Sequence, residues 1–196
     1  MANHVYTNIN IRFDDSEALR KFTFDILEYD KWMSGKLDGQ TYWERIEKLR
    51  YSYFKIICPD VENTRNDFID KLGAKWISFE DIDFDDDELT LTITSAWSPA
   101  FGLFERIYKH AAKLDPDVSL LIDWEDEGFN FIGAASYNKF GDDFDEYEPT
   151  EEDMELLINE ENDRSDEFYE MISDRKSDLI DCVLYNTSFT LNKPYE

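Results

Sequence analysis

Acidic side chains are the most abundant reactive groups of this sequence, and they are concentrated near its end. Residues 142–181 contain 18 acidic and three basic residues, so this segment has a net charge of 3 − 18 = −15. The whole chain has a formal net charge of −26 over 196 residues. An excess of this size attracts basic surfaces over long distances and speeds their association. We therefore expect the partner to present a basic surface.

The spacing of these carboxylates suggests what they could do. Carboxylates three or four residues apart on a helix stand about 5–6 Å from one another, which is similar to the spacing of phosphates along a nucleic-acid strand. A fixed row could therefore imitate a phosphate backbone and occupy the basic groove of a nucleic-acid-binding protein, with salt-sensitive affinity. The alternative is a charged face that serves only solvation. The candidate partner-binding acids are Asp142, Asp143, Asp145, Glu146, Glu152, Glu155, Asp166 and Glu170.

Few residues could support catalysis. His4 and His110 are the only histidines, and neither has a partner at metal-ligand spacing. Glycine-rich phosphate loops, His-Glu-x-x-His and Cys-x-x-Cys motifs are absent from the sequence. The two cysteines, Cys58 and Cys182, follow apolar stretches and are expected to be buried free thiols. We predict a protein that is not an enzyme and has no catalytic residue, metal site or cofactor.

Net charge and apolar content also limit the partners and the compartment. Direct nucleic-acid binding depends on Lys and Arg that neutralise phosphates, so a charge of −26 argues against it and against an anionic membrane. No apolar run reaches 18 residues, and no signal-peptide pattern is present. We therefore expect a cytoplasmic protein.

The stretch 88–133 contains the elements around which the rest of the chain is organised. Apolar residues alternate with threonines over 89–94, which predicts a half-buried strand. Ser98 is suited to the N-cap of a helix and Pro99 to its first position. An apolar stripe at helical spacing follows over 101–111.

Two more strands complete this stretch. Alternation over 118–124 predicts a strand, and Gly128 can supply the positive φ of a turn before a hairpin partner that begins at Phe129. The order strand, helix, strand, strand is typical of an α+β fold. Outside this stretch the patterns predict a strand over 4–13, helices over 14–27, 42–49 and 63–73, a short strand or extended arm over 53–57, and a strand over 76–84.

Several of these segments resemble the Api92-like / YubB ferredoxin-like family, whose members occur in phages, plasmids and bacterial mobile regions. The match covers roughly residues 1–140 and departs from the family at Ser95 and Ala100. It implies a ferredoxin-like antiparallel sheet with helices packed on one face, and no established chemistry. The matching segments are Met1-Ala2-Asn3, Tyr53-Phe54-Lys55-Ile56-Ile57-Cys58-Pro59, Gly73-Ala74-Lys75-Trp76, Leu91 to Trp97 with Pro99, and Trp124-Glu125-Asp126-Glu127-Gly128-Phe129 with Phe131 and Gly133.

The acidic end lies beyond this resemblance, and we expect two parts. Residues 1–141 would form the ferredoxin-like domain, and 142–196 an acidic helical extension. Apolar residues recur there at helical spacing, and Thr150 with Asp153 makes a capping box. These features predict two helices with a break near Asn162. Partial alternation over 183–191 suggests a last strand that joins the sheet.

Two functions remain open. The first is a phage- or mobile-element-type protein that binds and inhibits a basic, nucleic-acid-binding host protein, such as a host-defence factor, by DNA mimicry in the host cytoplasm. The second is a general interaction module that binds through an apolar groove near Trp97, with the acidity serving solubility. A homodimer formed through an edge strand is also open.

Overall fold

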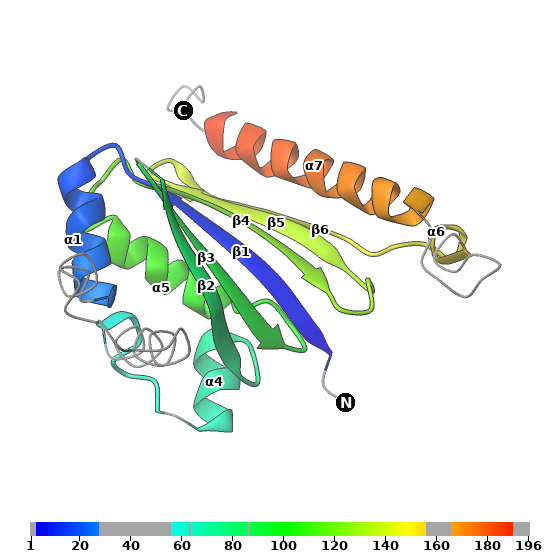
Figure 1. Cartoon of the computed structure of the whole chain (residues 1–196), viewed down its shortest axis with the longest axis horizontal. Helices are drawn as coiled ribbons and strands as arrows, with labels where there is room; N and C mark the ends of the chain where they lie inside the picture. Colours follow the sequence, from blue (N-terminus) through cyan, green and yellow to red (C-terminus); the bar gives the residue numbers. More distant parts are fainter. Residues whose placement is uncertain (1–2, 28–55, 63, 86, 156–165, 190–196) are drawn as a thin grey trace, which may run out of the picture.

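The structure is a computed structural model that describes residues 3–27, 56–62, 64–85, 87–155 and 166–189. Six strands are present in this part of the chain (Figure 1): β1 (His4–Arg12), β2 (Ile77–Asp85), β3 (Glu88–Ala96), β4 (Ser119–Asp126), β5 (Ile132–Asn138) and β6 (Gly141–Tyr147). The helices of the same part are α1 (Ser16–Leu27), α4 (Arg65–Leu72), α5 (Phe101–Ala111), α6 (Glu151–Glu155) and α7 (Asp166–Phe189).

The strands form one sheet in the order β2-β3-β1-β4-β5-β6, and every neighbouring pair is antiparallel. The first four strands, with α1 and α5 between them, follow the split β-α-β arrangement of ferredoxin-like folds. The hairpin of β5 and β6 extends the sheet on the β4 side. The predicted α+β class with a ferredoxin-like antiparallel sheet is therefore confirmed.

Alternating residues on the central strands build the main core. In β1 and β3, Ile9 pairs with Leu91 and Ile11 with Leu89, and all four are fully buried. Because side chains alternate between faces, the intervening polar residues face the other side of the sheet. There the Thr90 hydroxyl donates to the Asn10 side-chain oxygen at 2.9 Å, which satisfies polar groups across the strands.

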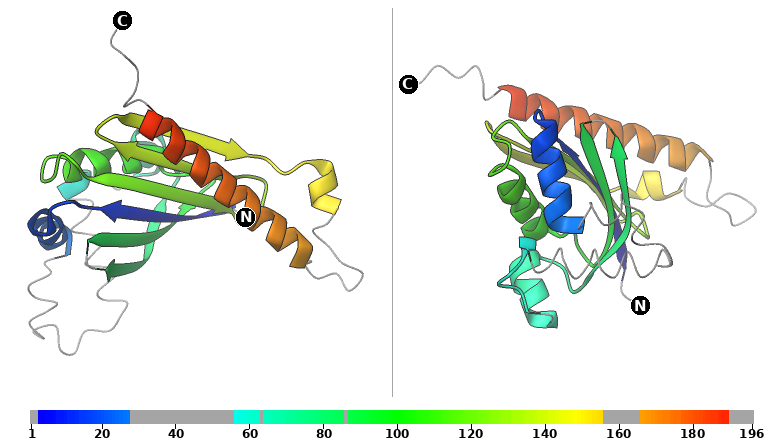
Figure 2. Two further views of the ribbon diagram at one scale, coloured as in Figure 1. Left: turned by 90° about the horizontal axis from the view of Figure 1, so that it is seen from above. Right: turned by 60° about the vertical axis from the view of Figure 1, so that its left-hand side comes forward.

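The described helices of residues 1–141 lie on one face of the sheet as predicted, and the acidic helix α7 covers the other face. Figure 2 shows α1, α4 and α5 on one side and α7 on the other. The second face has its own apolar cluster, because β5 directs Ile132 and Ala134 toward α7 while Ala135 belongs to the main core. From α7 this cluster receives Phe168, Ile172, Leu179 and Val183.

Two local predictions near the sheet end are wrong. The helix α5 begins at Phe101 rather than at Pro99, and its N-cap Ala100 makes no side-chain cap. Ser98 instead donates its hydroxyl to the carbonyl of Gly73, so it ties the start of α5 to the end of α4. In the turn after β4 the positive φ belongs to Phe129, at 56°, and not to Gly128.

The helix before β2 matches its prediction. Thr64 caps α4 by accepting from the N–H of Asp67, and Gly73 ends it with a φ of 83°. The expected strand or arm over 53–57 is not seen in its described part, since Ile56 and Ile57 are helical. The expected helix over 42–49 lies outside the described residues.

The end of the chain differs most from its prediction. Residues 141–147 form strand β6 rather than the start of a helical extension, so the expected domain boundary at 141/142 falls inside the β5–β6 hairpin. The expected strand over 183–191 is wrong over its described part, because α7 continues to Phe189. Two helices are present as predicted, α6 and α7, and the expected break near Asn162 lies outside the described residues.

Candidate partner-binding surface

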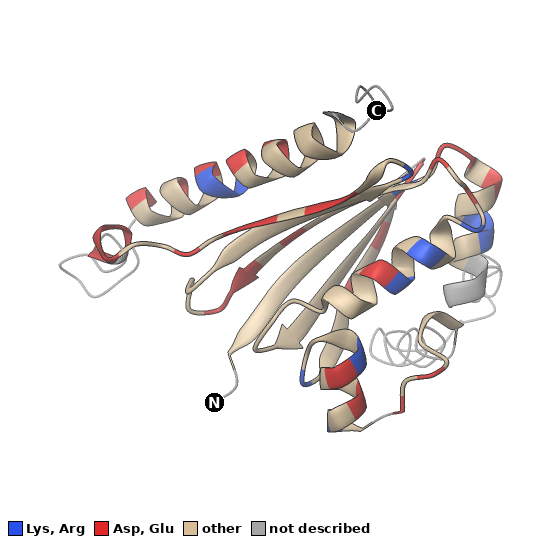
Figure 3. Ribbon diagram, turned by 180° about the vertical axis from the view of Figure 1, so that it is seen from behind, with Lys and Arg blue, Asp and Glu red and all other residues tan. Residues whose placement is uncertain are grey.

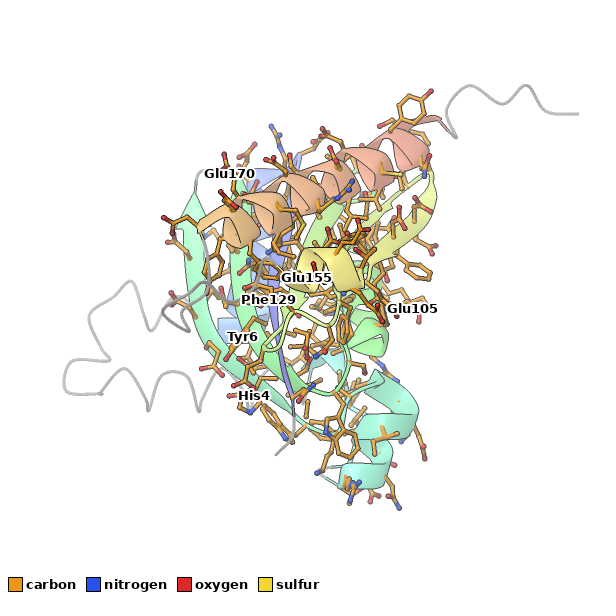
Figure 4. All side chains as sticks on the ribbon, turned by 90° about the vertical axis from the view of Figure 1, so that its right-hand side faces the viewer. His4, Tyr6, Glu105, Phe129, Glu155 and Glu170 are labelled. Carbon is orange, nitrogen blue, oxygen red and sulfur yellow. The ribbon has the colours of Figure 1, made fainter. Side chains whose placement is uncertain are left out.

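Six carboxylates form a row along the outer face of α7. At 100° per residue, the buried positions of α7 lie on one side of the helix, and these acids lie on the opposite side. Figure 4 shows Glu170 on the side of α7 that faces away from the sheet, and Phe129 beneath the helix. All six side chains are exposed. We call this row the acidic stripe: Asp166, Glu167, Glu170, Asp174, Asp178 and Asp181.

The charge density of the acidic stripe is close to that of a nucleic-acid strand. From Asp166 to Asp181 the helix rises by roughly 22 Å at about 1.5 Å per residue. Six charges over this length give about one charge per 4 Å, against about one per 3.4 Å of axis for one strand of B-DNA. The acidic stripe is a single straight row, so it could match one phosphate backbone of a duplex but not both.

The two basic residues of α7 differ in position: Lys176 lies on the side of the helix that faces the sheet, and Arg175 borders the acidic stripe. The ammonium group of Lys176 lies beneath the helix, 2.5 Å from an Asp123 oxygen and 3.3 Å from a Glu125 oxygen. Arg175 places its guanidinium over the Tyr147 ring, 5.2 Å from its centroid. No described residue forms an ion pair with a stripe carboxylate. In the described part of the chain the stripe carboxylates therefore have no ionic partner. Figure 3 shows α7 with several red bands and one blue stretch, whereas red and blue are more evenly mixed on α4 and α5.

The four acids predicted on 142–146 are split between the faces of the sheet. Because β6 is a strand, Asp143 and Asp145 share the α7 face, and the Asn186 amide donates to Asp143 at 2.8 Å. Asp142 and Glu146 share the α5 face, where Glu146 accepts from the Trp124 indole at 3.3 Å. These acids therefore do not continue one row.

The remaining predicted acids lie on the two helices. Glu152 and Glu155 are exposed on the short helix α6, whose start has the predicted capping box: Asp153 N–H donates to the Thr150 hydroxyl at 3.2 Å, and Thr150 N–H donates to the Asp153 carboxylate at 2.7 Å. Asp166 and Glu170 belong to the acidic stripe. The sequence reasoning missed four members of the stripe, although the helical spacing of Phe168, Ile172, Leu179 and Val183 marks the opposite face: Glu167, Asp174, Asp178 and Asp181.

Trp97 lies outside the acidic stripe and in a different electrostatic environment. Its side chain is 50% exposed and its φ is 77°, an uncommon value for a bulky residue. Lys75 lies 4.5 Å and Arg65 lies 5.5 Å from the centroid of the indole ring. Instead of the predicted apolar groove, the ring is thus flanked by two cations.

The two cysteines lie in different environments. Burial raises the pKa of the Cys58 thiol to about 12, so this buried cysteine is not a thiolate nucleophile at neutral pH. Cys182 is exposed rather than buried, which corrects its prediction. Partial loss of contact with water, followed by the neighbouring carboxylate of Asp145, raises the pKa of its thiol. Within the described ranges no group of three His, Cys, Asp or Glu residues could hold a metal ion.

Trp124 shows which aromatic residues belong to the core. It is fully buried and packs its ring against Phe101, with ring centroids 5.2 Å apart.

Among the described helices, none combines the length and the apolar character that crossing a membrane requires.

Comparisons with known proteins leave the family open. No family model matches the chain, and no curated protein matches it. One solved structure has some likeness, a crystal structure of A. aeolicus tRNASec in complex with M. kandleri SerRS, at 10% identity and a TM-score of 0.32. The alignment covers 100% of this chain and 33% of that one. The resemblance to the Api92-like / YubB family stays a hypothesis.

Proposed function

We propose that the protein binds a basic surface of another protein through the acidic stripe. The observation that supports this most directly is the arrangement of charge on α7: six exposed carboxylates lie on one face, Lys176 is paired beneath the helix, and Arg175 at the border of the stripe contacts the Tyr147 ring. The helix is fixed to the sheet by the apolar cluster around Phe168, so the carboxylates keep their relative positions. A pre-positioned array can be recognised by shape as well as by charge.

The chemistry of a suitable partner follows from the spacing. A row with about one charge per 4 Å fits Lys and Arg that are arranged to follow one phosphate backbone. The partner class is therefore a nucleic-acid-binding protein, whose groove the acidic stripe would occupy in competition with nucleic acid. Under this proposal the protein acts by binding and without catalysis, and a host-defence factor of a cell that carries a phage or mobile element is one such partner.

A charge-reversal experiment tests the proposal. In the test variant, Glu167, Glu170, Asp174 and Asp178 are replaced by Lys, which changes the net charge from −26 to −26 + 8 = −18. We expect this variant to lose at least about tenfold in affinity for a labelled lysine-rich peptide at about 50 mM salt. Wild-type binding should also weaken steeply toward about 500 mM salt, because exposed charges are screened.

A second variant controls for net charge alone. Replacing Glu17, Asp70, Glu105 and Glu148 by Lys gives the same net charge of −18 but alters exposed acids outside α7. This variant should keep most of the affinity. Equal losses in the two variants would show that binding follows net charge rather than the acidic stripe. For partners captured from a cell extract, release by added DNA would indicate competition for a nucleic-acid site.

Trp97 supports a second candidate function, an interaction through its half-exposed ring. The observation that favours it is the positive φ of 77°, because strained backbone of this kind is often kept for a functional reason. With Lys75 and Arg65 beside the ring, such a partner would present carboxylates or phosphates. Trp97→Ala should then abolish binding that the α7 variant leaves intact.

A further inference from the structure

The outer edge of β6 has the geometry of an open pairing site. In the sheet order β6 is an end strand, so no described strand pairs with its outer side. Its register with β5 is unbroken from Ile132↔Tyr147 to Asn138↔Gly141. The opposite end strand, β2, has a bulge between Phe79 and Asp81. Since bulges blunt an edge against pairing, β6 is the more receptive of the two edges.

The turn before β6 determines which backbone groups point outward. Only Lys139 and Phe140 separate the paired residues Asn138 and Gly141, so these two form the hydrogen-bonded pair that closes the hairpin. Hydrogen-bonded and non-hydrogen-bonded pairs alternate along an antiparallel ladder. The residues of β6 in non-hydrogen-bonded pairs therefore direct their N–H and C=O groups away from β5: Asp142, Phe144 and Glu146. Of these groups, the Glu146 N–H already donates to the Asp145 side chain at 2.9 Å.

The side chains of β6 place charges and one exposed aromatic ring along this edge. Phe144 is 64% exposed at the middle of the strand, and its ring lies 5.6 Å from that of Phe101. Asp142 and Glu146 lie on either side of it on the same face, and Asp143 and Asp145 lie on the other face. Charge alone would protect the edge from self-pairing, but it does not account for an exposed ring at its centre.

We propose that the edge of β6 accepts an extended basic segment of the partner as a seventh strand. This inference rests on the proposed function, because it assigns a second contact to the same basic partner. The added strand would hydrogen-bond to the outward groups of Asp142 and Phe144 and to the carbonyl of Glu146. An apolar residue would lie opposite Phe144, and Lys or Arg would lie opposite the four acids. The recognised pattern is therefore basic-basic-apolar-basic-basic.

The same charges exclude a second copy of this chain as the occupant. Pairing of two β6 strands would bring the acids of one copy opposite or diagonal to those of the other, and like charges across a sheet are destabilising. A neutral strand would gain only the backbone hydrogen bonds and the contact with Phe144. The edge thus discriminates in favour of a basic strand by repelling acidic ones.

Backbone methylation of a peptide probe tests this inference with side chains held constant. The probe is a labelled peptide with Lys-Lys-Phe-Lys-Lys at its centre. With its Phe opposite Phe144, the two outer lysines direct their N–H groups toward β6, and the two inner lysines direct theirs away. N-methylation of the outer pair should weaken binding at least about tenfold, and N-methylation of the inner pair should change it little. Equal affinities for the two methylated peptides, or no binding of the unmethylated probe, would overturn the inference.

Two measurements on the protein separate this inference from the proposed function. Amide exchange at Asp142 and Phe144 should slow when the unmethylated probe binds. If reversal of the acidic stripe abolishes binding while the two methylated peptides bind alike, the proposed function stands and strand addition fails. The opposite outcome is also possible: the charge-reversed variant binds the unmethylated probe as tightly as wild type and still binds the two methylated peptides differently. Strand addition then stands, and the role of the acidic stripe fails.

Discussion

At the residue scale, Lys176 reduces the repulsion between the acidic helix α7 and the acidic residues of the strand beneath it. Its ammonium group lies between α7 and the carboxylates of Asp123 and Glu125 on β4. Burial alone would lower the pKa of Lys176, but the attraction of Asp123, followed by that of Glu125, raises it overall. The ion pairs of Lys176 with Asp123 and Glu125 therefore help to hold α7 on the sheet.

Replacing Lys176 by Met should destabilise the protein, because two carboxylates would remain under the helix without their cation. We expect a loss of about 2–3 kcal/mol in the free energy of unfolding, somewhat below the roughly 3–5 kcal/mol for fully buried pairs. A raised pKa means that the stabilisation is complete below the unfolded value of about 10.4 and is lost as pH rises through the folded pKa. Denaturant titrations at neutral and alkaline pH measure both effects.

The neighbouring Arg175 is the matched control. Its exposed guanidinium contacts the Tyr147 ring, so Arg175→Met should cost no more than about 1 kcal/mol. If the two variants lose the same stability at neutral pH, the position of Lys176 beneath the helix has no special role.

At the element scale, α7 depends on its apolar contacts with β4 and β5. Phe168 is fully buried, and its ring centroid lies 5.4 Å from that of Phe129. Phe168→Ala should lower the free energy of unfolding by about 3–4 kcal/mol, the usual range for a large core aromatic. In hydrogen exchange, the amides of α7 should lose protection before those of β1 and β3, whose core is separate.

The next residue provides the comparison for this prediction. Tyr169 is 45% exposed and contacts Phe129 from the side of the helix, so Tyr169→Ala should cost about 1 kcal/mol. Equal losses of α7 protection in the two variants would contradict a helix anchored through Phe168.

The same elements show how far sequence patterns reach. β1, β3 and β4 could be predicted because buried and polar residues alternate along them. β6 was missed because its acids lie on both faces and its one large apolar residue, Phe144, is exposed, so the strand has no apolar period. The incorrect prediction of a strand over 183–191 rests on partial alternation within a few residues. The spacing of Phe168, Ile172, Leu179 and Val183 over a longer window is helical.

For the candidate site, the sequence predicts an acidic region but not its geometry. The sequence identifies Asp166 and Glu170, and it predicts that the four acids of 142–146 flank the same binding surface. Strand alternation separates them onto two faces, and this depends on the pairing of β6 with β5, which no local pattern reveals. The contacts of Lys176 with Asp123 and of Arg175 with Tyr147 depend on tertiary structure, because the partners are distant in sequence. A local pattern cannot predict them.

At the scale of the whole molecule, the net charge of −26 is distributed so that both ends of the sheet carry acids. On β2, Glu80, Asp81 and Asp83 accompany the bulge, and on β6 the protection comes from charge alone. Acidic edges oppose sheet-to-sheet association between copies of the chain. We therefore expect a monomer at neutral pH and moderate salt.

Neutralising the edge of β6 should remove that protection. In one variant Asp142, Asp143 and Asp145 become Asn and Glu146 becomes Gln, which changes the net charge to −26 + 4 = −22. Without like charges, the outward backbone groups and the exposed ring of Phe144 can pair with a second copy, so dimers should form at about 100 μM in sedimentation equilibrium. The control carries the corresponding amides on the acidic stripe, at Glu167, Glu170, Asp174 and Asp178, and has the same net charge. It should remain monomeric, because the stripe offers no unpaired backbone. Dimers in both variants would mean that total charge, and not the edge of β6, keeps copies of the protein apart.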